Sequence, residues 1–516
     1  MTRTHRFLGG VTFGYVSLIL ATVVGLWLTP FLLHRIGSHD LGLWLITTQI
    51  LGYLMLLDLG VVALAPRETA YATGRALGGD ADDTALIFAR FRTIVRWQII
   101  STALVCGLAW WAVTARWPEL RLPLAAILTA FVATFPSRLY RATLQGLQDL
   151  SYLGKVQLAG WGAGTIVTVA LVLAGVGLVA LAAGWVTTQV TSSLACAVRL
   201  RRRFGPIWNA PVATPSLRAS RELVRQSGWT SVSQIGQVFL HGSDLLVLGA
   251  VLGPAATVPY ACTGKLITVL ANHPQLLMQA AAPAIAEMRT SAPRAQLARV
   301  AVALARAMLI LSGAVACFVL AANQAFVDWW VGAEQFAGMR LTFLLLAAML
   351  CRHFATTMVY GLFSFGHERR LSLTAISDGI LTLIVTGGLA MFTGLGLASA
   401  PIGSLAGVLL VTIPVCGLAL ARELEITPVA LVSSLSGWAV RFAAAAGICF
   451  VGAPFLEGYG VLGLVGIAAG VAIVYGALMW PLALEAPLGP YVRTVVSSVA
   501  LSLGIRRQLA AVEPRA

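Results

Sequence analysis

The sequence predicts an all-α polytopic membrane protein with about fourteen transmembrane helices. Of its 516 residues, 58% are hydrophobic and 11% are charged, whereas a soluble domain carries about 25% charged residues. Apolar runs of about 20 residues or more recur from Leu8 to near Pro481, with short polar breaks between them. The alternating pattern of an outer-membrane barrel is absent from the sequence. These observations together favour a helical bundle in lipid.

The expected spans follow one another in a regular series. The first starts after Arg3 and Arg6 and lacks the short apolar region and cleavage site of a secretory signal, so we expect it to stay uncleaved. Glycine and proline mark later breaks, as at 175–177 and 253–254. The predicted spans cover residues 8–32, 41–65, 97–115, 122–146, 153–175, 177–198, 227–252, 255–287, 300–322, 341–366, 371–393, 397–421, 428–452 and 461–484.

A basic polar stretch, residues 199–226, is the longest internal break and predicts the domain organisation. Six spans precede it and eight follow. Gly37 with Trp44 matches Gly253 with Tyr260 at the same offset, which indicates two six-helix lobes in the same orientation. The predicted parts are an N-terminal lobe (1–198), a cytoplasmic basic linker (199–226), a C-terminal lobe (227–421), two further spans (428–484) and a cytoplasmic tail (485–516).

The formal net charge of +15 is explained by membrane topology rather than by nucleic-acid binding. If the N-terminus is cytoplasmic, most arginines fall in inner loops and tails, as the positive-inside rule requires. The predicted outer loops then hold few basic residues, which are Arg35, Arg116, Arg121 and Arg340. Both termini are therefore expected in the cytoplasm.

Several kinds of chemistry are disfavoured. The seven cysteines all lie in apolar runs without CxxC pairs, which favours small core residues over metal or redox sites, and no cofactor is expected. Gly264-Lys265 lacks the upstream glycine of a nucleotide-binding loop. The outer loops are too short for a catalytic domain, so we do not expect an enzyme. Closely spaced glycines, such as Gly160/Gly164 and Gly403/Gly407, instead indicate close helix packing.

Two consecutive spans carry long polar faces, and these are the candidate substrate-contacting residues. Each face recurs in steps of three or four residues, which places its members on one side of a helix. Lipid cannot satisfy such groups, so the faces either hydrogen-bond to other helices or line a hydrated cavity, and we favour the cavity. The candidates are Gln234, Gln237, His241 and Asp244 on the first face, and Lys265, Asn272 and Gln275 on the second.

Two of these residues form a predicted charge pair. Asp244 lies nine residues before Gly253, and Lys265 lies twelve residues after it. A rise of about 1.5 Å per residue gives them similar depths in the membrane. The pair is either a static lock between neighbouring helices or a proton-sensitive contact that releases Lys265 to meet an anionic substrate.

Asp58 lies in an apolar stretch near the predicted cytoplasmic side. Arg138 and Arg141 are expected at a similar depth, and Arg67 lies two to three turns further along. This group predicts either a structural ion pair or an inner gate. Arg352 and Arg441 are expected nearer the midplane, where a guanidinium facing a cavity suits an anionic lipid head group.

The N-terminal region resembles bacterial polysaccharide exporters. The residues that carry this resemblance are Gly37, Leu41-Gly42-Leu43-Trp44, Leu56-Leu57-Asp58-Leu59-Gly60 and Arg67. They are similar to Wzx-type members of the multidrug/oligosaccharidyl-lipid/polysaccharide (MOP) flippase superfamily. The span count and basic linker extend this similarity over most of the chain.

The resemblance implies a central cavity that opens alternately to each side of the bacterial inner membrane. The implied substrate is an undecaprenyl-pyrophosphate-linked oligosaccharide for surface polysaccharide or lipopolysaccharide biosynthesis. Implied partners are membrane lipids, a coupling proton or sodium ion, and polysaccharide polymerase or assembly proteins. The arginines expected in the first two spans of lipid II flippases are missing, which argues against lipid II as the substrate.

Two alternatives remain open. A multidrug or cation extruder of the same superfamily would use Asp58 or Asp244 to bind cations or protons. A membrane glycosyltransferase, O-antigen ligase or polymerase would need catalytic groups at the outer face. The acidic residues expected there are scattered, namely Glu119, Asp328, Glu334 and Glu457.

Overall fold

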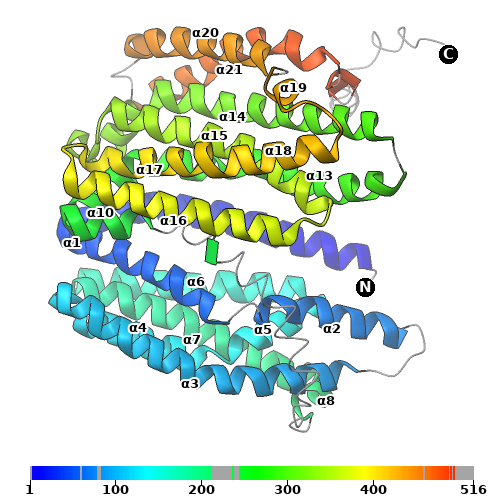
Figure 1. Ribbon diagram of the computed structural model, residues 1–516. Helices are drawn as coiled ribbons and strands as arrows, with labels where there is room; N and C mark the ends of the chain where they lie inside the picture. The colour runs from blue at the N-terminus through cyan, green and yellow to red at the C-terminus, as the bar shows by residue number, and fades with distance from the viewer. Residues whose placement is uncertain are drawn as a thin grey trace. The chain divides into compact units, whose positions relative to one another are not determined.

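The computed structural model describes residues 3–58, 61–77, 83–210, 235–236, 243–291, 293–433, 435–456, 460–486, 488–490 and 492–493. Helices and short turns account for this described part of the chain, and no strand occurs in it (Figure 1). The chain divides into two compact units, Met1–Val258 and Pro259–Ala516. Each unit has its own helix packing.

The first unit is built from long helices joined by short 3₁₀ turns. Its longest element, α1, joins the first two predicted spans across a kink. The elements are α1 (Arg3–Leu54), η1 (Met55–Asp58), α2 (Val61–Leu77), α3 (Thr84–Arg116), η2 (Pro118–Leu120), α4 (Arg121–Thr134), α5 (Ser137–Gly146), α6 (Leu150–Leu173), α7 (Leu178–Arg203), α8 (Gly205–Trp208), α10 (Asp244–Leu252) and η3 (Pro254–Ala256).

The kink in α1 lies at Gly37, whose φ and ψ are 81° and 170°. Gly253, the residue matched to it in the sequence, adopts nearly the same conformation, with φ 93° and ψ 156°. A side chain disfavours a positive φ, so glycine suits both positions. The two glycines therefore end one helix and start the next in the same way.

Gly42 brings α1 against η3. A Cβ atom at this position would lie 2.0 Å from the carbonyl oxygen of Pro254, so only glycine allows the observed approach. α1 also packs on α10. These contacts explain why the first compact unit continues to Val258, beyond the predicted basic linker. The predicted lobe boundary at 199–226 stays a prediction, since residues 211–234 lie outside the described part.

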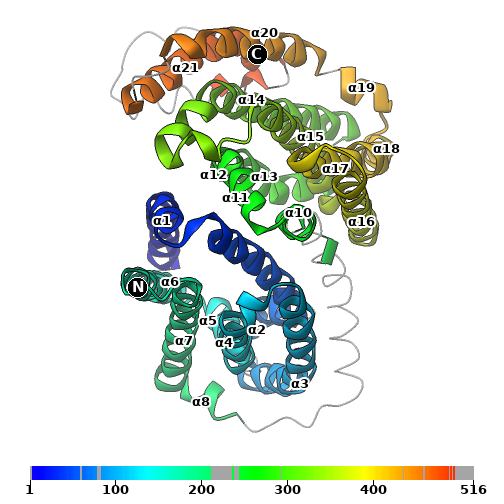
Figure 2. The same cartoon turned by 90° about the vertical axis from the view of Figure 1, so that its left-hand side faces the viewer.

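Helices α6 and α7 pack closely, and both views show them side by side (Figures 1 and 2). A Cβ atom at Gly160 would meet the Ser192 hydroxyl, and one at Gly164 would meet the Thr188 hydroxyl. The prediction that these glycines allow close packing is confirmed. Gly403 and Gly407 do the same in the second unit, against α16 (Glu368–Phe392).

The second unit surrounds the 38-residue helix α14. Buried residues of α14 pack against α20 and α21 on one side and against α13, α15 and α18 on another. The remaining elements, besides α14 (Arg294–Val331) and α16, are α11 (Thr257–Thr263), α12 (Lys265–Leu270), α13 (Asn272–Ser291), η4 (Ala333–Gln335), α15 (Met339–Ser364), η5 (Gly396–Ala398), α17 (Ser399–Gly407), the π-helical turn η6 (Val408–Thr412), α18 (Ile413–Glu423), α19 (Pro428–Ser433), α20 (Ser436–Gly452), η7 (Ala453–Leu456) and α21 (Gly460–Leu484).

Among the described residues, nine helical segments are long and apolar enough to cross a membrane. A tenth possible span is the pair Pro118–Thr134 and Ser137–Gly146, which bends by 50° between its halves. The shorter apolar helix Ser436–Gly452 matches the thirteenth predicted span. The helical membrane fold is thus confirmed, and the count of fourteen is compatible with these segments.

Candidate functional site

The eighth predicted span, residues 255–287, is not one helix. It is divided into α11, α12 and α13, with turns at Gly264 and Ala271. Pro274 explains the second turn, because its ring nitrogen cannot donate to the carbonyl of Leu270 four residues earlier. Broken helices in transporters commonly carry binding sites, since their breaks free backbone polar groups. Lys265 is the first residue of α12, directly after the first break.

The polar face of this broken span is open. Thr268 and Asn272 are exposed, and Lys265 and Gln275 are half-buried. The Asn272 side-chain amide donates to the Thr268 carbonyl at 3.3 Å, and the Thr268 hydroxyl donates to the Lys265 carbonyl at 2.9 Å. These hydrogen bonds lie within the span itself and do not close the face. An exposed polar surface on a spanning helix supports contact with water or a polar substrate rather than with lipid.

A buried asparagine anchors the first break. Asn323 on α14 is fully buried, and its amide nitrogen donates to the Thr263 carbonyl and to the Thr342 hydroxyl, at 3.0 Å each. The Thr263 hydroxyl in turn accepts a 2.9 Å hydrogen bond from the Ala337 backbone N–H. The last residue of α11 is thus held from two sides, which positions Lys265 two residues later. Asn323 was not among the candidates from the sequence, because it lies one residue beyond the predicted span 300–322 and beside Gln324.

The seventh predicted span is described only in part. Gln234, Gln237 and His241 lie outside the described residues. Asp244 is the half-buried first residue of α10. The preceding Ser243 is joined by a side-chain hydrogen bond to Tyr53 on α1, and the Asp244 carboxylate lies within electrostatic range of the Tyr53 hydroxyl.

The two residues of the predicted pair lie in different compact units, Asp244 in Met1–Val258 and Lys265 in Pro259–Ala516. It remains a prediction.

Arg138 approaches the end of α1. Its guanidinium donates to the Met55 carbonyl oxygen at 3.2 Å and lies over the rings of Phe131 and Phe135. Met55 starts the 3₁₀ turn that ends at Asp58, so the structure brings Arg138 to the predicted segment. The Asp58 side chain itself lies outside the described part.

The other two arginines of this group have different partners. Arg141 donates to the Gln157 side-chain oxygen on α6 at 2.9 Å. The exposed Arg67 lies over the ring of Tyr71, with 5.3 Å between its guanidinium carbon and the ring centroid. These contacts favour separate structural roles for Arg67 and Arg141 over a single arginine cluster.

Arg352, expected at a cavity, is bound to an internal carboxylate. Its two terminal nitrogens donate to the two oxygens of Asp378 on α16, at 3.1 Å each. Its Nε donates to the Ser404 hydroxyl at 2.8 Å. The Asp378 side chain is fully buried, and the Arg352 side chain is 18% exposed. Arg352 therefore has its charge matched inside the second unit.

Two threonines complete the environment of the Asp378 carboxylate. Thr382 donates to Oδ1 at 3.2 Å, and Thr412 donates to Oδ2. Thr412 ends the π-helical turn η6, and Pro414 explains that turn, since it cannot bond to the Leu410 carbonyl. Sequence analysis missed Asp378. The criterion that singled out Asp58, a carboxylate alone in an apolar run, would have found it.

Arg441 pairs with Glu485, with 3.7 Å between their nearest nitrogen and oxygen atoms. Glu485 directly follows the last residue of α21, and Arg441 lies only five residues after the start of α20. Arg441 thus lies near the start of α20 and the end of α21, and its expected depth near the midplane stays a prediction. The predicted span 428–452 is broken between α19 and α20.

Metal ligands do not gather in the described part of the chain, where no group of three or more histidine, cysteine or acidic side chains could hold an ion. The seven cysteines are free thiols, and all except the half-buried Cys351 are buried, as expected of core residues. The described acidic residues of the predicted outer side lie on three elements: Glu119 on η2, Asp328 on α14 and Glu334 on η4.

Known proteins share parts of this sequence and its fold. A family model described as polysaccharide biosynthesis protein matches residues 82–337. No curated protein matches the chain in sequence. The solved structure of the lipid II flippase MurJ in an inward closed conformation is similar with a TM-score of 0.58 and 11% identity, covering 92% of this chain and 100% of that one.

Two other solved structures are similar over most of their length. An inward-facing multidrug resistance MATE family transporter of the MOP superfamily gives a TM-score of 0.55 at 15% identity, covering 81% of this chain and 95% of that one. A MOP superfamily transporter from Pyrococcus furiosus gives 0.56 at 15% identity, with coverage of 81% and 96%. At such identities the similarity shows a shared fold. The chain is thus a multi-pass membrane protein with the fold of the MOP superfamily, and its residues 82–337 match the polysaccharide biosynthesis protein family.

Proposed function

We propose that this protein is a flippase for an undecaprenyl-pyrophosphate-linked oligosaccharide of surface polysaccharide biosynthesis. The match of residues 82–337 to the polysaccharide biosynthesis protein family supports a role in polysaccharide biosynthesis. The fold shared with a lipid II flippase supports the type of transport.

The observation that carries the proposal is the open polar face on the broken span α11–α13. Exposed Thr268 and Asn272 offer a hydroxyl and an amide, which are suitable partners for sugar hydroxyls. Lys265 adds a cation next to a helix break, where it could meet a pyrophosphate. A purely lipid-facing helix would expose none of these groups.

Alternating access is the expected mechanism. The binding site would open in turn to each side of the membrane, with both termini in the cytoplasm of the bacterial cell. The lipid-linked saccharide would enter from the inner leaflet and leave to the outer one. A proton or sodium ion would supply the coupling, and polysaccharide polymerase or assembly proteins would receive the product.

The decisive experiment is a flipping assay with purified protein in liposomes. A fluorescent undecaprenyl-pyrophosphate oligosaccharide placed in both leaflets should become fully accessible to a membrane-impermeant reagent when the protein is present. Deleting the gene should stop export of one surface polysaccharide and leave its lipid-linked repeat unit at the inner leaflet. Normal export after deletion would contradict the proposal.

A multidrug or cation extruder is the second candidate, because the fold is also shared with a multidrug resistance transporter. That function predicts a different phenotype. The deletion strain would export its polysaccharide normally and become more sensitive to cationic drugs. Asp244 would then be the cation-binding carboxylate, and neutralising it would reproduce the drug sensitivity.

A further inference from the structure

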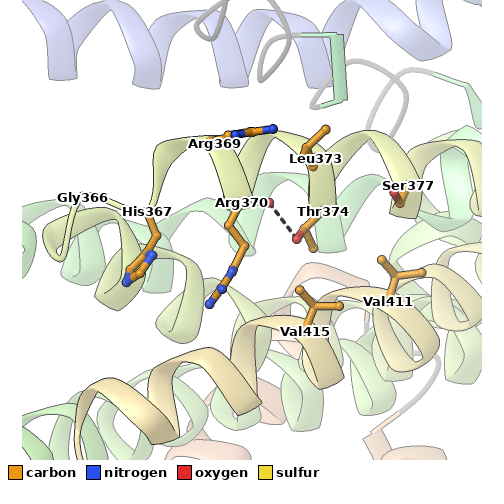
Figure 3. A pocket seen from close by; sticks show the side chains of 9 residues that line it. All are labelled: Gly366, His367, Arg369, Arg370, Leu373, Thr374, Ser377, Val411 and Val415. Carbon is orange, nitrogen blue, oxygen red and sulfur yellow. Dashed lines mark hydrogen bonds between the residues drawn. The ribbon is translucent and has the colours of Figure 1, made fainter.

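A groove lies between helix α16 and the segment η6–α18 of the second unit. The groove is open to the outside and has a volume of about 550 Å³ (Figure 3). Its two ends differ in chemistry: the end near the start of α16 is basic, and the other end is apolar. It is lined by Gly366, His367, Arg369, Arg370, Leu373, Thr374, Ser377, Val411 and Val415.

Arg370 supplies a positive charge at the basic end of the groove. In Figure 3 its side chain points into the space between the two helices. Within the described part of the chain, no side-chain hydrogen bond or ion pair engages the Arg370 guanidinium. Arg369 on the same turn adds a second positive charge to the lining. An anion can therefore approach Arg370 without displacing an existing partner.

Two acidic residues belong to this end: Glu368 is exposed in the first turn of α16, and Glu423 is already occupied. His367 forms a 2.7 Å hydrogen bond from its Nε2 atom to an oxygen of Glu423, the last residue of α18. Arg294 lies 3.9 Å from the other oxygen of Glu423. Glu423 is thus shared between His367 and Arg294. No side chain caps the first turn of α16, whose free N–H groups add partial positive charge.

The apolar end continues along an exposed helix face. Leu373 is 49% exposed and Val415 is 40% exposed, and both line the groove. Ile380 and Ile384 are exposed on α16 at seven and eleven residues after Leu373, which places all three on one helix face. At a rise of about 1.5 Å per residue, this face runs for about 16 Å. Half of a hydrocarbon core of about 30 Å has nearly this depth.

We propose that this groove binds one anionic glycerophospholipid of the cytoplasmic leaflet, outside the transport route. Arg370 binds the phosphate, and one acyl chain lies along Leu373, Ile380 and Ile384. Positive-inside topology places the start of α16 at the cytoplasmic head groups, where anionic lipids meet basic pockets between helices. Inorganic phosphate would use only the basic end of the groove and leave its apolar half in contact with other lipids.

The test compares lipid binding by purified full-length variants in detergent. The two groove variants are Arg370→Gln, which removes the charge, and Val415→Trp, which fills the apolar end. Both positions are exposed, so both variants should fold. Arg340→Gln is the matched control, since Arg340 is an exposed arginine at the start of α15, toward the predicted outer side. Dioleoylphosphatidylglycerol is the probe, and bound lipid is counted by native mass spectrometry and by its effect on the melting temperature.

We expect wild-type protein and Arg340→Gln to retain phosphatidylglycerol with equal affinity. Arg370→Gln should bind it about tenfold more weakly, the loss typical of one charged contact. Val415→Trp should also bind it more weakly, although every charge is kept. Dioleoylphosphatidylcholine and inorganic phosphate should bind wild-type protein far more weakly than phosphatidylglycerol does.

Three results would overturn the proposal. Equal phosphatidylglycerol binding by Arg370→Gln and wild type would exclude the basic end as the head-group site. Full competition by inorganic phosphate at low millimolar concentration would indicate a simple anion site without an acyl subsite. A groove that binds undecaprenyl pyrophosphate in preference to phosphatidylglycerol would belong to the transport route instead.

Discussion

The Arg352 guanidinium on α15 and the Asp378 carboxylate on α16 form a two-pronged ion pair, with both N···O distances at 3.1 Å. Ser404 on α17 and Thr412 in η6 hydrogen-bond to the same pair. One charged cluster therefore joins three neighbouring predicted spans. Its satisfied geometry favours a structural role for Arg352 in the second unit.

Removing one partner of this pair should strongly destabilise the protein. Arg352→Gln leaves the fully buried Asp378 carboxylate without its cation, which typically costs about 3–5 kcal/mol. The melting temperature in detergent can be followed with a thiol-reactive dye, because most cysteines are buried free thiols. Arg340→Gln, an exposed arginine on the same helix, should change it little.

Removing both charges should restore most of the stability that Arg352→Gln loses. In the double variant Arg352→Met/Asp378→Leu, no charge is buried, and the apolar side chains occupy similar volumes. A double variant that melts no higher than Arg352→Gln would show that the hydroxyl contacts with Ser404 and Thr412, rather than charge balance, hold these helices. If it melts normally yet fails to transport, the pair serves transport directly.

Gly42→Ala should loosen the first unit. The added methyl group would lie 2.0 Å from the Pro254 carbonyl oxygen, so α1 must move away from η3. Overpacking of this kind costs about 1–3 kcal/mol. The control is Gly52→Ala on the same helix, where no atom lies within 4 Å of the new methyl group. That control should leave the protein unchanged or stabilise it by about 0.5–1 kcal/mol.

Asn323→Ala should disturb the broken span from a distance. It leaves the buried Thr263 carbonyl without its donor, at a cost of about 1–3 kcal/mol. Lys265 lies two residues beyond Thr263, so transport should fall more than stability alone explains. Ser312→Ala, a buried side-chain change on the same α14 helix, provides the comparison. Equal transport per folded molecule in both variants would show that Asn323 does not position the site.

Lys265 and Asp244 should both be required for transport. If Asp244 and Lys265 are a functional pair, Asp244→Asn and Lys265→Met will each abolish flipping in liposomes, and the double variant will not regain it. The reason is that the lysine must meet the pyrophosphate and the carboxylate must release it. A double variant that transports normally would show instead that the pair only holds helices together.

Labelling of single cysteines tests the predicted topology. In a variant without native cysteines, Thr214→Cys should react only with reagents applied from the cytoplasm. Glu334→Cys in η4 should react from outside the cell. The expectation rests on the excess of arginine in the predicted inner loops. Labelling of Thr214→Cys from outside would reverse the orientation and move the phospholipid groove to the opposite leaflet.

Much of the fold could be predicted because lipid imposes one simple rule on the chain. Every spanning backbone must satisfy its own hydrogen bonds, so apolar runs of sufficient length become helices. The bounds of α6, α7, α15, α16 and α21 accordingly lie within a few residues of the predicted spans, except where α7 continues to Arg203. The glycines at 37 and 253 could also be read as breaks, since few other residues accept their backbone conformation.

The contacts of charged residues could not be predicted in the same way. Arg352 and Asp378 are 26 residues apart, and hydrophobic periodicity does not state which helices become neighbours. The break within 255–287 was also missed, because each part remains apolar enough to continue a helix. The pairing of Arg441 with Glu485 could not be predicted either, because a span boundary derived from composition alone does not show where α20 begins.

The sequence by itself determined that the chain crosses a membrane as a series of helices, because burial of apolar surface and backbone hydrogen bonding depend only on local composition. It also indicated a polar face at Lys265, Asn272 and Gln275, because helical spacing is local. Only the tertiary structure decided that Arg352 is neutralised by Asp378, that Asn323 holds the break before Lys265, and that Arg370 opens into a groove. These depend on which helices pack together, and that is fixed by side-chain fit between segments far apart in the chain.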